Sequence, residues 1–364
     1  MILFVNFERF TISNMRYITL GLSTLLAMVA CVILFESSKK KEKPFRVMFY
    51  NVENLFDTDD DANVEDEEYL PQGELHWDKE KMQTKLLHIA QVIDALGSGS
   101  LPDIVGFAEI ENRKVLDLLL QNTELKKSDY SIVHFDSPDK RGIDVGLLYR
   151  KERFTFVKCG KYPVAIPGDT GKPTRDILYV KGLLPNASAL HILVNHWPSR
   201  SGGTAETEHK RIAAAKTAKR LCDSIQFNEK NANILLMGDF NDYPTNQSLK
   251  EVLNAALDTG AVNAALYNLM GWQHGEGVGS HTYKGEWGFL DQVIASGALV
   301  KGTSGAKVFF KDARVFKADF LMEKNEKYGV MEPKRTYGGK KYLGGYSDHL
   351  PVFVDVRLLP TSNK

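Results

Sequence analysis

The sequence has little of several features that mark specialised classes of protein. Only three of its 364 residues are cysteine (Cys31, Cys159 and Cys222), which excludes a scaffold held together by disulfides. Lysine plus arginine equals aspartate plus glutamate at 46 each, so there is no overall positive field to attract nucleic acid. Internal repeats and long linkers are absent as well. The remaining composition, 43% hydrophobic and 25% charged, is typical of a folded protein with a large core.

The longest apolar run lies near the N-terminus, at residues 18–35 (ITLGLSTLLAMVACVILF). Its length is at the border between the core of a signal peptide and a membrane-spanning helix. We therefore expect residues 1–35 to be a signal peptide or an N-terminal membrane anchor, which contacts the membrane during export or afterwards. Lipidation at Cys31 is a further alternative. Residues 36–44 are polar and predict a tether, so the sequence predicts an exported protein.

Residues 45–358 contain the patterns of a single folded domain, and a tail follows at 359–364. Short apolar runs predict strands at 45–49, 104–108, 130–135, 145–149, 153–157, 177–183, 190–194, 234–237, 289–295 and 352–356. Helices are expected from an N-cap at Asp78 to Gly97, and at 115–120, 204–227 and 248–257. Because most strands follow strands, the pattern predicts an α+β fold of mixed, mostly antiparallel sheets flanked by helices.

Six short motifs each join an apolar, strand-like run to a polar end. They read FRVMFYNVEN, DIVGFAEIEN, LHILVNHWPSR, ILLMGDFND, GFLDQVIAS and YSDHLPVFVDV. Residues at strand ends and in the adjoining loops commonly build functional sites. Oxygen ligands for a hard cation can come from Asn51, Glu53, Glu109 and Asp348. Mg²⁺ suits such a set, with Mn²⁺ or Ca²⁺ as alternatives.

The other polar residues of these motifs fit the hydrolysis of a phosphoester, which needs an activated water and relief of charge on the leaving oxygen. Asp239 and Asn241 could move a proton and hold the attacking water. His349 could act as a general base or stabilise the transition state, with Asp291 fixing its tautomer. His196 could donate to a nonbridging oxygen or protonate the leaving group. Each residue alone could instead cap a turn or form a surface ion pair.

The six motifs, in this order, resemble those of the endonuclease/exonuclease/phosphatase superfamily, which is related to DNase I. The resemblance covers about residues 45–357 and implies a four-layer α/β/β/α sandwich with the site at one mouth of the sheet pair. It implies the following roles: metal and water positions at Asn51 and Glu53, the principal metal ligand at Glu109, a catalytic position at His196, the GDFN pair at Asp239 and Asn241, the histidine partner at Asp291, and the terminal Asp348 and His349.

Within this superfamily, the segments NVENLFDT, RGIDVGLLYR and NHWPSRSGG are most similar to a branch of extracellular nucleases of bacteria. That similarity implies a periplasmic, outer-surface or membrane-anchored protein. Arg175 resembles a phosphate-contacting arginine of DNase I-like members. Arg200 follows His196 closely and is placed to reach an anion beside Gly202 and Gly203.

The substrate class is less defined by the sequence than the reaction. A metal-dependent endonuclease acting on DNA or RNA, as a monomer, is our first interpretation. A phosphatase, or a phosphodiesterase for phospholipids or inositol phosphates, is the alternative, and an inactive binding module is a third. A nuclease needs a basic groove, for which the candidates are Arg200, Lys210, Arg211, Lys284, Lys334, Arg335, Lys340 and Lys341. Tyr337 or Tyr342 could stack on a base.

Overall fold

The computed structural model describes residues 43–97, 99–168, 173–258, 260–261 and 263–360. The chain from Phe45 onward forms one compact unit. The expected signal peptide or anchor, all but the last two residues of the tether, and residues 361–364 of the tail lie outside the described residues. Among the described helices, none has both the length and the apolar character needed to cross a bilayer.

The first large sheet contains the N-terminal and C-terminal strands side by side, in the order β14-β20-β1-β2-β4-β3, with β15 also paired to β20. Its strands are β1 (Phe45–Leu55), β2 (Ile104–Ile110), β3 (Tyr130–His134), β4 (Asp144–Arg150), β14 (Ala306–Lys307), β15 (Ala313–Val315) and β20 (Val352–Leu358). The pair β1–β2 is parallel and the other pairs are antiparallel.

The second large sheet has the order β5-β6-β7-β8-β13-β10-β9. Its strands are β5 (Thr155–Tyr162), β6 (Ile177–Leu183), β7 (Ala189–His196), β8 (Ile234–Asp239), β9 (Ala255–Ala256), β10 (Leu266–Asn268) and β13 (Asp291–Ser296). The pairs β7–β8 and β9–β10 are parallel and the rest are antiparallel, as expected for mixed sheets.

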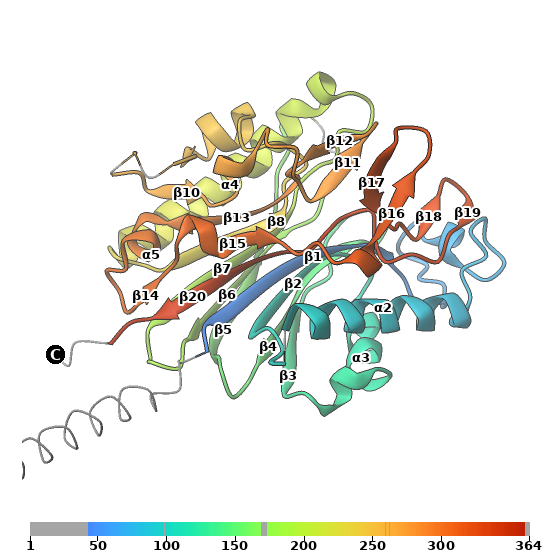
Figure 1. The fold of residues 1–364 in the computed structure, drawn as a ribbon, viewed down its shortest axis with the longest axis horizontal. Coiled ribbons are helices and arrows are strands. Elements are labelled where there is room, and N and C mark those ends of the chain that lie inside the picture. The colour runs from blue at the N-terminus through green and yellow to red at the C-terminus, as the bar shows by residue number, and fades with distance from the viewer. Residues whose placement is uncertain (1–42, 98, 169–172, 259, 262, 361–364) are drawn as a thin grey trace, which may run out of the picture. The chain divides into compact units, whose positions relative to one another are not determined.

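Helices cover the outer face of each sheet. Figure 1 shows α2 (Lys79–Gly97) and α3 (Arg113–Gln121) beneath the first sheet and α4 (Thr204–Asn228) above the second; α5 (Gly297–Lys301) is a short turn after β13. Asp78 caps α2 as predicted, because its Oδ1 accepts from the backbone N–H groups of Glu80 and Lys81 at 3.0 and 2.9 Å. Single turns of 3-10 helix occur at Glu67–Tyr69, Glu124–Lys127, Gly271–Gln273, Phe310–Asp312 and Asp319–Leu321.

Alternation along the strands produces three apolar layers. In β1, Val47 and Phe49 point into the core between the two sheets, whereas Met48 and Tyr50 pack against the helices. A third core joins the second sheet to α4 through residues such as Cys222. The order helix, sheet, sheet, helix confirms the predicted four-layer sandwich.

The prediction of a helix at 248–257 is wrong. Only one turn of π-helix forms, at Ser248–Val252, and β9 follows directly. Asn254 takes a left-handed conformation (φ 57°), which asparagine tolerates better than most residues and which ends a helix. Ala255 then pairs with Leu266 of β10, so the chain returns to the sheet.

Three small hairpins gather at one end of the sheet pair, on the right in Figure 1. They are β11 (His281–Tyr283) with β12 (Glu286–Gly288), β16 (Met322–Asn325) with β17 (Val330–Pro333), and β18 (Tyr337–Gly338) with β19 (Lys341–Tyr342). Since β1 runs toward this end, the polar residues that follow its apolar half lie among the hairpins.

Candidate active site

Strand register brings most of the predicted site residues to this one end. Asn51 lies opposite Ala108 in the parallel pair β1–β2, one residue before Glu109. In the second sheet, Asp239 pairs with His196 of β7 on one side and with Asp291 of β13 on the other. The meeting of these strand ends is therefore a consequence of the fold and not of local sequence.

Three of the predicted residues lie in left-handed backbone conformations. The φ angles of Glu53, Glu109 and Asn241 are 51°, 63° and 51°. The β1 and β2 ladders are irregular at the same places, because their register shifts between Asn51 and Leu55 and between Ala108 and Ile110. Such local strain in non-glycine residues is concentrated at functional sites, and here it turns each side chain out of the regular alternation.

Asn51 connects the two sheets. Its side chain is fully buried, and its Nδ2 donates to Glu109 Oε1 at 3.2 Å and to Asp239 Oδ2 at 3.1 Å. Its Oδ1 accepts from the backbone N–H of Glu53 at 3.0 Å. Because both donor hydrogens are used on carboxylates, Asn51 fixes the spacing between the acidic groups of the two sheets.

A buried carboxylate and imidazole form the second feature of the site. His349 Nδ1 and Asp291 Oδ2 are 2.6 Å apart. Burial acts to lower the pKa of His349, but the charge and hydrogen bond of Asp291, together with Asp348 and Asp239, raise that pKa well above its usual value. His349 therefore holds a proton at neutral pH and presents its Nε2 at 3.9 Å from Asp239 Oδ2.

Asp239 and His196 face each other across the parallel pair β7–β8. Burial raises the pKa of Asp239 to about 7, with the charge of Asp291 adding to it and His349 opposing it. For His196, burial and the nearby Arg175 and Arg141 charges lower the pKa well below its usual value, so the ring is neutral. Its Nε2 lies 3.7 Å from carboxylate oxygens of both Glu109 and Asp239.

Asn241 completes this half of the site. Its backbone N–H donates to Asp239 Oδ1 at 2.9 Å, and its Nδ2 donates to the carbonyl oxygen of Trp197 at 3.0 Å. These two bonds hold the tight GDFN turn and leave the amide oxygen of Asn241 as an acceptor.

A group of carboxylates occupies the other half. Glu53, Glu109 and Asp348 line one cavity of about 460 Å³. Burial, with the negative charge of Asp348 adding to it, raises the pKa of Glu53 to about 7. Carboxylate oxygens are the ligands that a hard divalent cation such as Mg²⁺ prefers, and the charge of a cation bound in this cavity would relieve the repulsion between them.

One buried cation stabilises this group from behind. Lys85 of α2 is fully buried, and burial lowers its pKa to about 8 although Glu53 opposes that shift. Its Nζ donates to Thr336 Oγ1 and to the carbonyl oxygen of Tyr346, the latter at 2.7 Å. The backbone N–H groups of Thr336 and Tyr337 in turn donate to the Glu53 carboxylate at 2.6 and 3.2 Å.

A second cavity of about 600 Å³ opens over the remaining residues, with His196, Asp239, Asn241 and His349 in its wall. Glu109 and Arg141 line both cavities. Arg141 is about half exposed, and its Nε lies 3.6 Å from Asp139 Oδ1. The two cavities thus meet at one cationic side chain suited to a phosphate.

The two arginines expected to bind substrate have other partners. Arg175 is buried, donates to Asp139 Oδ2 and to the Trp197 carbonyl oxygen at 2.9 and 2.7 Å, and lies outside both cavity linings. Arg200 does line the larger cavity. Its guanidinium, however, is held by the carbonyl oxygen of Asn241 at 2.8 Å and by Asp242 at 3.2 Å.

Several expected groove residues also have structural roles. Arg211 is fully buried against Asp242 at 2.8 Å, so it is not part of a surface groove. Tyr337 and Tyr342 pack against each other with ring centroids 5.3 Å apart, and Lys81 lies over the Tyr342 ring. Tyr337 also donates to the carbonyl oxygen of Leu75 at 3.0 Å.

Three residues at the site were missed by sequence reasoning. Arg141 begins the segment RGIDVGLLYR, whose similarity to extracellular nucleases does not by itself give this residue a role. His281 and the exposed Tyr283 of β11 line the larger cavity. His281 pairs with His349 through an isolated β-bridge. No local signal in the sequence indicates that pairing, because it joins segments 68 residues apart.

A protein-family model with the description Endonuclease/Exonuclease/phosphatase family matches residues 46–358, and the chain belongs to this family. The match spans nearly all of the described unit and agrees with the resemblance of the six motifs. Members of this superfamily are phosphoric ester hydrolases. No curated protein sequence matches the chain.

Solved structures share the fold at low sequence identity. The human Nocturnin catalytic domain with bound sulfate anion is 17% identical, with a TM-score of 0.51 over 86% of this chain and 94% of that chain. Danio rerio TDP2 complexed with a single-strand DNA product is 15% identical, with a TM-score of 0.51 over 87% and 100%. A functionally unknown protein from Enterococcus faecalis V583 is 13% identical, with a TM-score of 0.52 over 86% and 99%.

Proposed function

We propose that this protein is an exported, Mg²⁺-dependent phosphodiesterase that acts as a monomer on DNA or RNA. The observation that supports the proposal most strongly is the gathering of Glu109, His196, Asp239 and His349 around one cavity from four distant segments. An inactive protein that had kept only the fold would gain nothing from burying these charged groups together, because burial of charge is unfavourable.

The carboxylates of Glu53, Glu109 and Asp348, with Asn51, would hold the cation. When bound, Mg²⁺ supplies positive charge to a phosphoryl oxygen and lowers the pKa of a coordinated water, and Mn²⁺ or Ca²⁺ could replace it. Asn51 has a supporting role in this arrangement, since its amide already donates to Glu109 and Asp239.

Asp239 is the group best placed to accept a proton from the attacking water. A pKa of about 7 puts this carboxyl near the pH at which a general base is most effective. Asn241 keeps it in position through the 2.9 Å bond to Oδ1, and its free amide oxygen can orient the water.

The two histidines have different protonation states and so different roles. His349, protonated and held by Asp291, donates a charged hydrogen bond to a nonbridging oxygen of the phosphate, where negative charge grows in the transition state. Of the two roles expected from the sequence, its raised pKa favours stabilisation over base catalysis. His196 is neutral, which favours hydrogen-bond donation to the phosphate over protonation of the leaving group.

Nucleic acid is the proposed substrate because cations and one exposed ring surround the cavities. Arg141, Arg335 and Lys340 line the smaller cavity, and Tyr283 lines the larger one with 63% of its surface exposed. Cations can follow a phosphate backbone, and an exposed ring can stack on a base. The DNA product bound to the TDP2 structure is in keeping with such a substrate on this fold.

Export is proposed from the apolar segment 18–35 and from the similarity to extracellular nucleases of bacteria. Either a cleaved signal peptide or a retained anchor at residues 1–35, followed by the tether at 36–44, would present the domain at 45–358 outside the cytoplasm. Fractionation of cells that express the full chain would detect it in the periplasm, in the medium or with membranes. Recovery in the cytoplasm alone would contradict the proposal.

The activity is tested with the full chain, purified in mild detergent, on plasmid DNA, RNA, sphingomyelin and p-nitrophenyl phosphate, each with Mg²⁺ and with EDTA. We expect cleavage of DNA or RNA in Mg²⁺ only. Cleavage of sphingomyelin or of the monoester in preference to nucleic acid would support the alternative substrate classes. His209→Ala, at an exposed position on α4, is the control for nonspecific effects of losing a histidine.

A further inference from the structure

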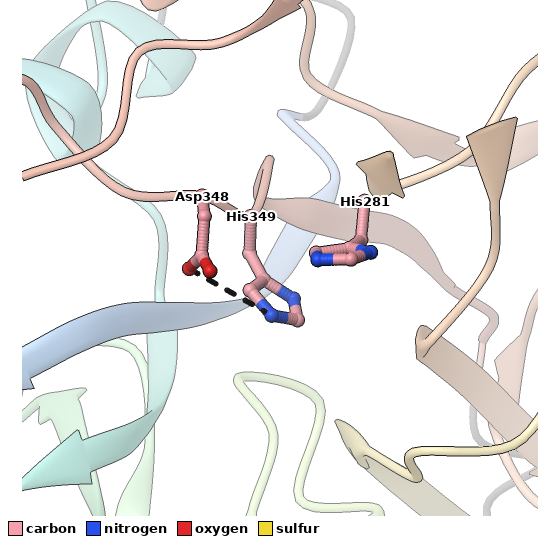
Figure 2. A group of neighbouring side chains, drawn as sticks. All are labelled: His281, Asp348 and His349. Atoms are coloured by element: carbon pink, nitrogen blue, oxygen red, sulfur yellow. Dashed lines mark ion pairs between the residues drawn. The ribbon is translucent and has the colours of Figure 1, made fainter. Parts of the chain in front are cut away.

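Two imidazoles and a carboxylate converge at the rim between β11 and the loop before β20. One ligand atom each from His281, Asp348 and His349 lies within 4.8 Å of the others. Figure 2 shows the three side chains projecting next to one another. The rings of His281 and His349 have centroids 4.8 Å apart, and His349 Nε2 lies 3.9 Å from Asp348 Oδ1.

The donor atoms of this cluster remain available. Asp348 uses its Oδ2 to accept from Arg335 at 2.8 Å, which leaves Oδ1 on the side of His349. His349 uses Nδ1 for Asp291, which leaves Nε2. Within the described residues, no hydrogen bond to the ring of His281 is found. Once Nε2 of His349 releases its proton, one lone pair from each residue can point to a common centre.

The chemistry of this donor set differs from that of the carboxylate group. Two imidazole nitrogens and one oxygen suit a borderline-soft ion such as Zn²⁺, whereas Mg²⁺ prefers oxygen donors. Donor atoms around tetrahedral Zn²⁺ are about 3.4 Å apart, given metal–donor bonds of about 2.1 Å. The observed 3.9 Å between Nε2 and Oδ1 needs little adjustment, and the outer limit of 4.8 Å needs a side-chain movement of about 1.4 Å.

The surroundings of His349 also match those of a metal-binding histidine. Histidine ligands commonly donate their second ring N–H to a carboxylate, which fixes the tautomer and strengthens the ligand. Asp291 makes this contact at 2.6 Å from the opposite side of the ring. Binding of Zn²⁺ would replace the proton on Nε2, and that proton would pass to water.

We infer that His281, Asp348 and His349 form a binding site for Zn²⁺ or a similar ion, and that occupation of this site inhibits the enzyme. The inhibitory half of the inference rests on the proposed function, because it follows from the removal of His349 from contact with phosphate. Asp348 would also be withdrawn from the Mg²⁺ ligands. The site thus makes the activity sensitive to the level of free zinc outside the cytoplasm.

Binding is tested without any activity measurement. The full chain competes with a chromophoric zinc chelator for ZnCl₂ in the presence of excess Mg²⁺. His281→Phe keeps a ring beside His349 but has no nitrogen donor, and His281→Gln removes the ring. We expect one Zn²⁺ per wild-type chain, and at least tenfold weaker binding in both variants.

Two further histidine variants distinguish zinc binding at this site from zinc binding elsewhere on the chain. His209→Gln, on the exposed face of α4, should bind as the wild type does. His196→Gln tests a different cluster of potential ligands at the active site, formed by Glu109, His196 and Asp239. Wild-type zinc affinity in both His281 variants, no zinc bound by the wild type, or loss of binding only in His196→Gln would each overturn the inference.

The inhibitory half is tested by titrating ZnCl₂ into the nuclease assay at fixed Mg²⁺. We expect the zinc concentration for half inhibition to rise at least tenfold in His281→Phe relative to His209→Gln. Zinc binding without inhibition would overturn the inference that zinc inhibits the enzyme, but not the inference that zinc binds at this site. Absence of any phosphodiesterase activity would contradict the proposed function but would leave the binding result standing.

Discussion

The carboxyl group of Glu111 should make the stability of this fold depend on pH. Glu111 follows β2, is 6% exposed, and accepts from the backbone N–H of Asp57 at 2.6 Å. Burial, with the negative charges of Asp57 and Asp66 adding to it, raises the pKa of Glu111 from 4.5 to about 8. The same AEIEN motif therefore holds one site carboxylate, Glu109, and one carboxyl that is protonated at neutral pH.

The sign of the effect follows from proton linkage. Between pH 4.5 and about 8, folded Glu111 keeps its proton and unfolded Glu111 loses it. Since the folded state binds more protons, the free energy of unfolding falls as pH rises through this window and levels off above it. With about 1.4 kcal/mol for each pKa unit, the loss is at most about 5 kcal/mol.

The change Glu111→Gln tests this reasoning, because glutamine keeps the shape of the protonated acid and can accept the Asp57 hydrogen bond. Urea unfolding in EDTA at pH 5 and pH 9 gives the free energies. We expect similar stability at pH 5 and an advantage of several kcal/mol for the variant at pH 9. Glu124→Gln, at a solvent-exposed position, is the matched control. A difference between variant and wild type that does not change with pH would refute the reasoning.

Three further substitutions test contacts around the site. Asp291→Asn should lower turnover by about a hundredfold or more, since His349 loses its charged partner at 2.6 Å; nuclease assays that show near wild-type rates would contradict this. Lys85→Met should cost about 3 kcal/mol or more in urea unfolding, because Glu53 loses its buried counter-charge; an equally stable variant would be inconsistent with that role. Gly238→Ala should cost about 1–3 kcal/mol in thermal unfolding, because the new Cβ would lie 2.3 Å from the Asn195 carbonyl oxygen; an unchanged melting temperature would argue against the close approach of β7 and β8.

The sequence predicted the features that depend on local pattern. The short apolar run at 45–49 and the cap at Asp78 lead directly to β1 and α2, because burial and capping act over a few residues. The helix at 248–257 failed because pairing of Ala255 with β10 outweighed local propensity.

The candidate site was predicted in part for a similar reason. Residues such as Asp239 and Asp291 stand in motifs at strand ends, and the ends of neighbouring strands in one sheet meet in space. The partners of Arg175 and the place of His281 depend on contacts between distant segments. The neutral state of His196 depends on its burial and on the charges of Arg175 and Arg141. These contacts form only in the folded protein, so the motif around His196 does not indicate them.

The measurement that tests the central claim most directly is the hydrolysis of bis(p-nitrophenyl) phosphate by the full chain. The rate is followed with Mg²⁺, after addition of EDTA, and after Mg²⁺ is restored, for the wild type and for His349→Ala and Asp239→Asn. We predict wild-type turnover that stops with EDTA and returns with the metal, and rates at least about a hundredfold lower in both variants. Turnover that persists in EDTA, or variants that hydrolyse the ester as fast as the wild type, would contradict the account.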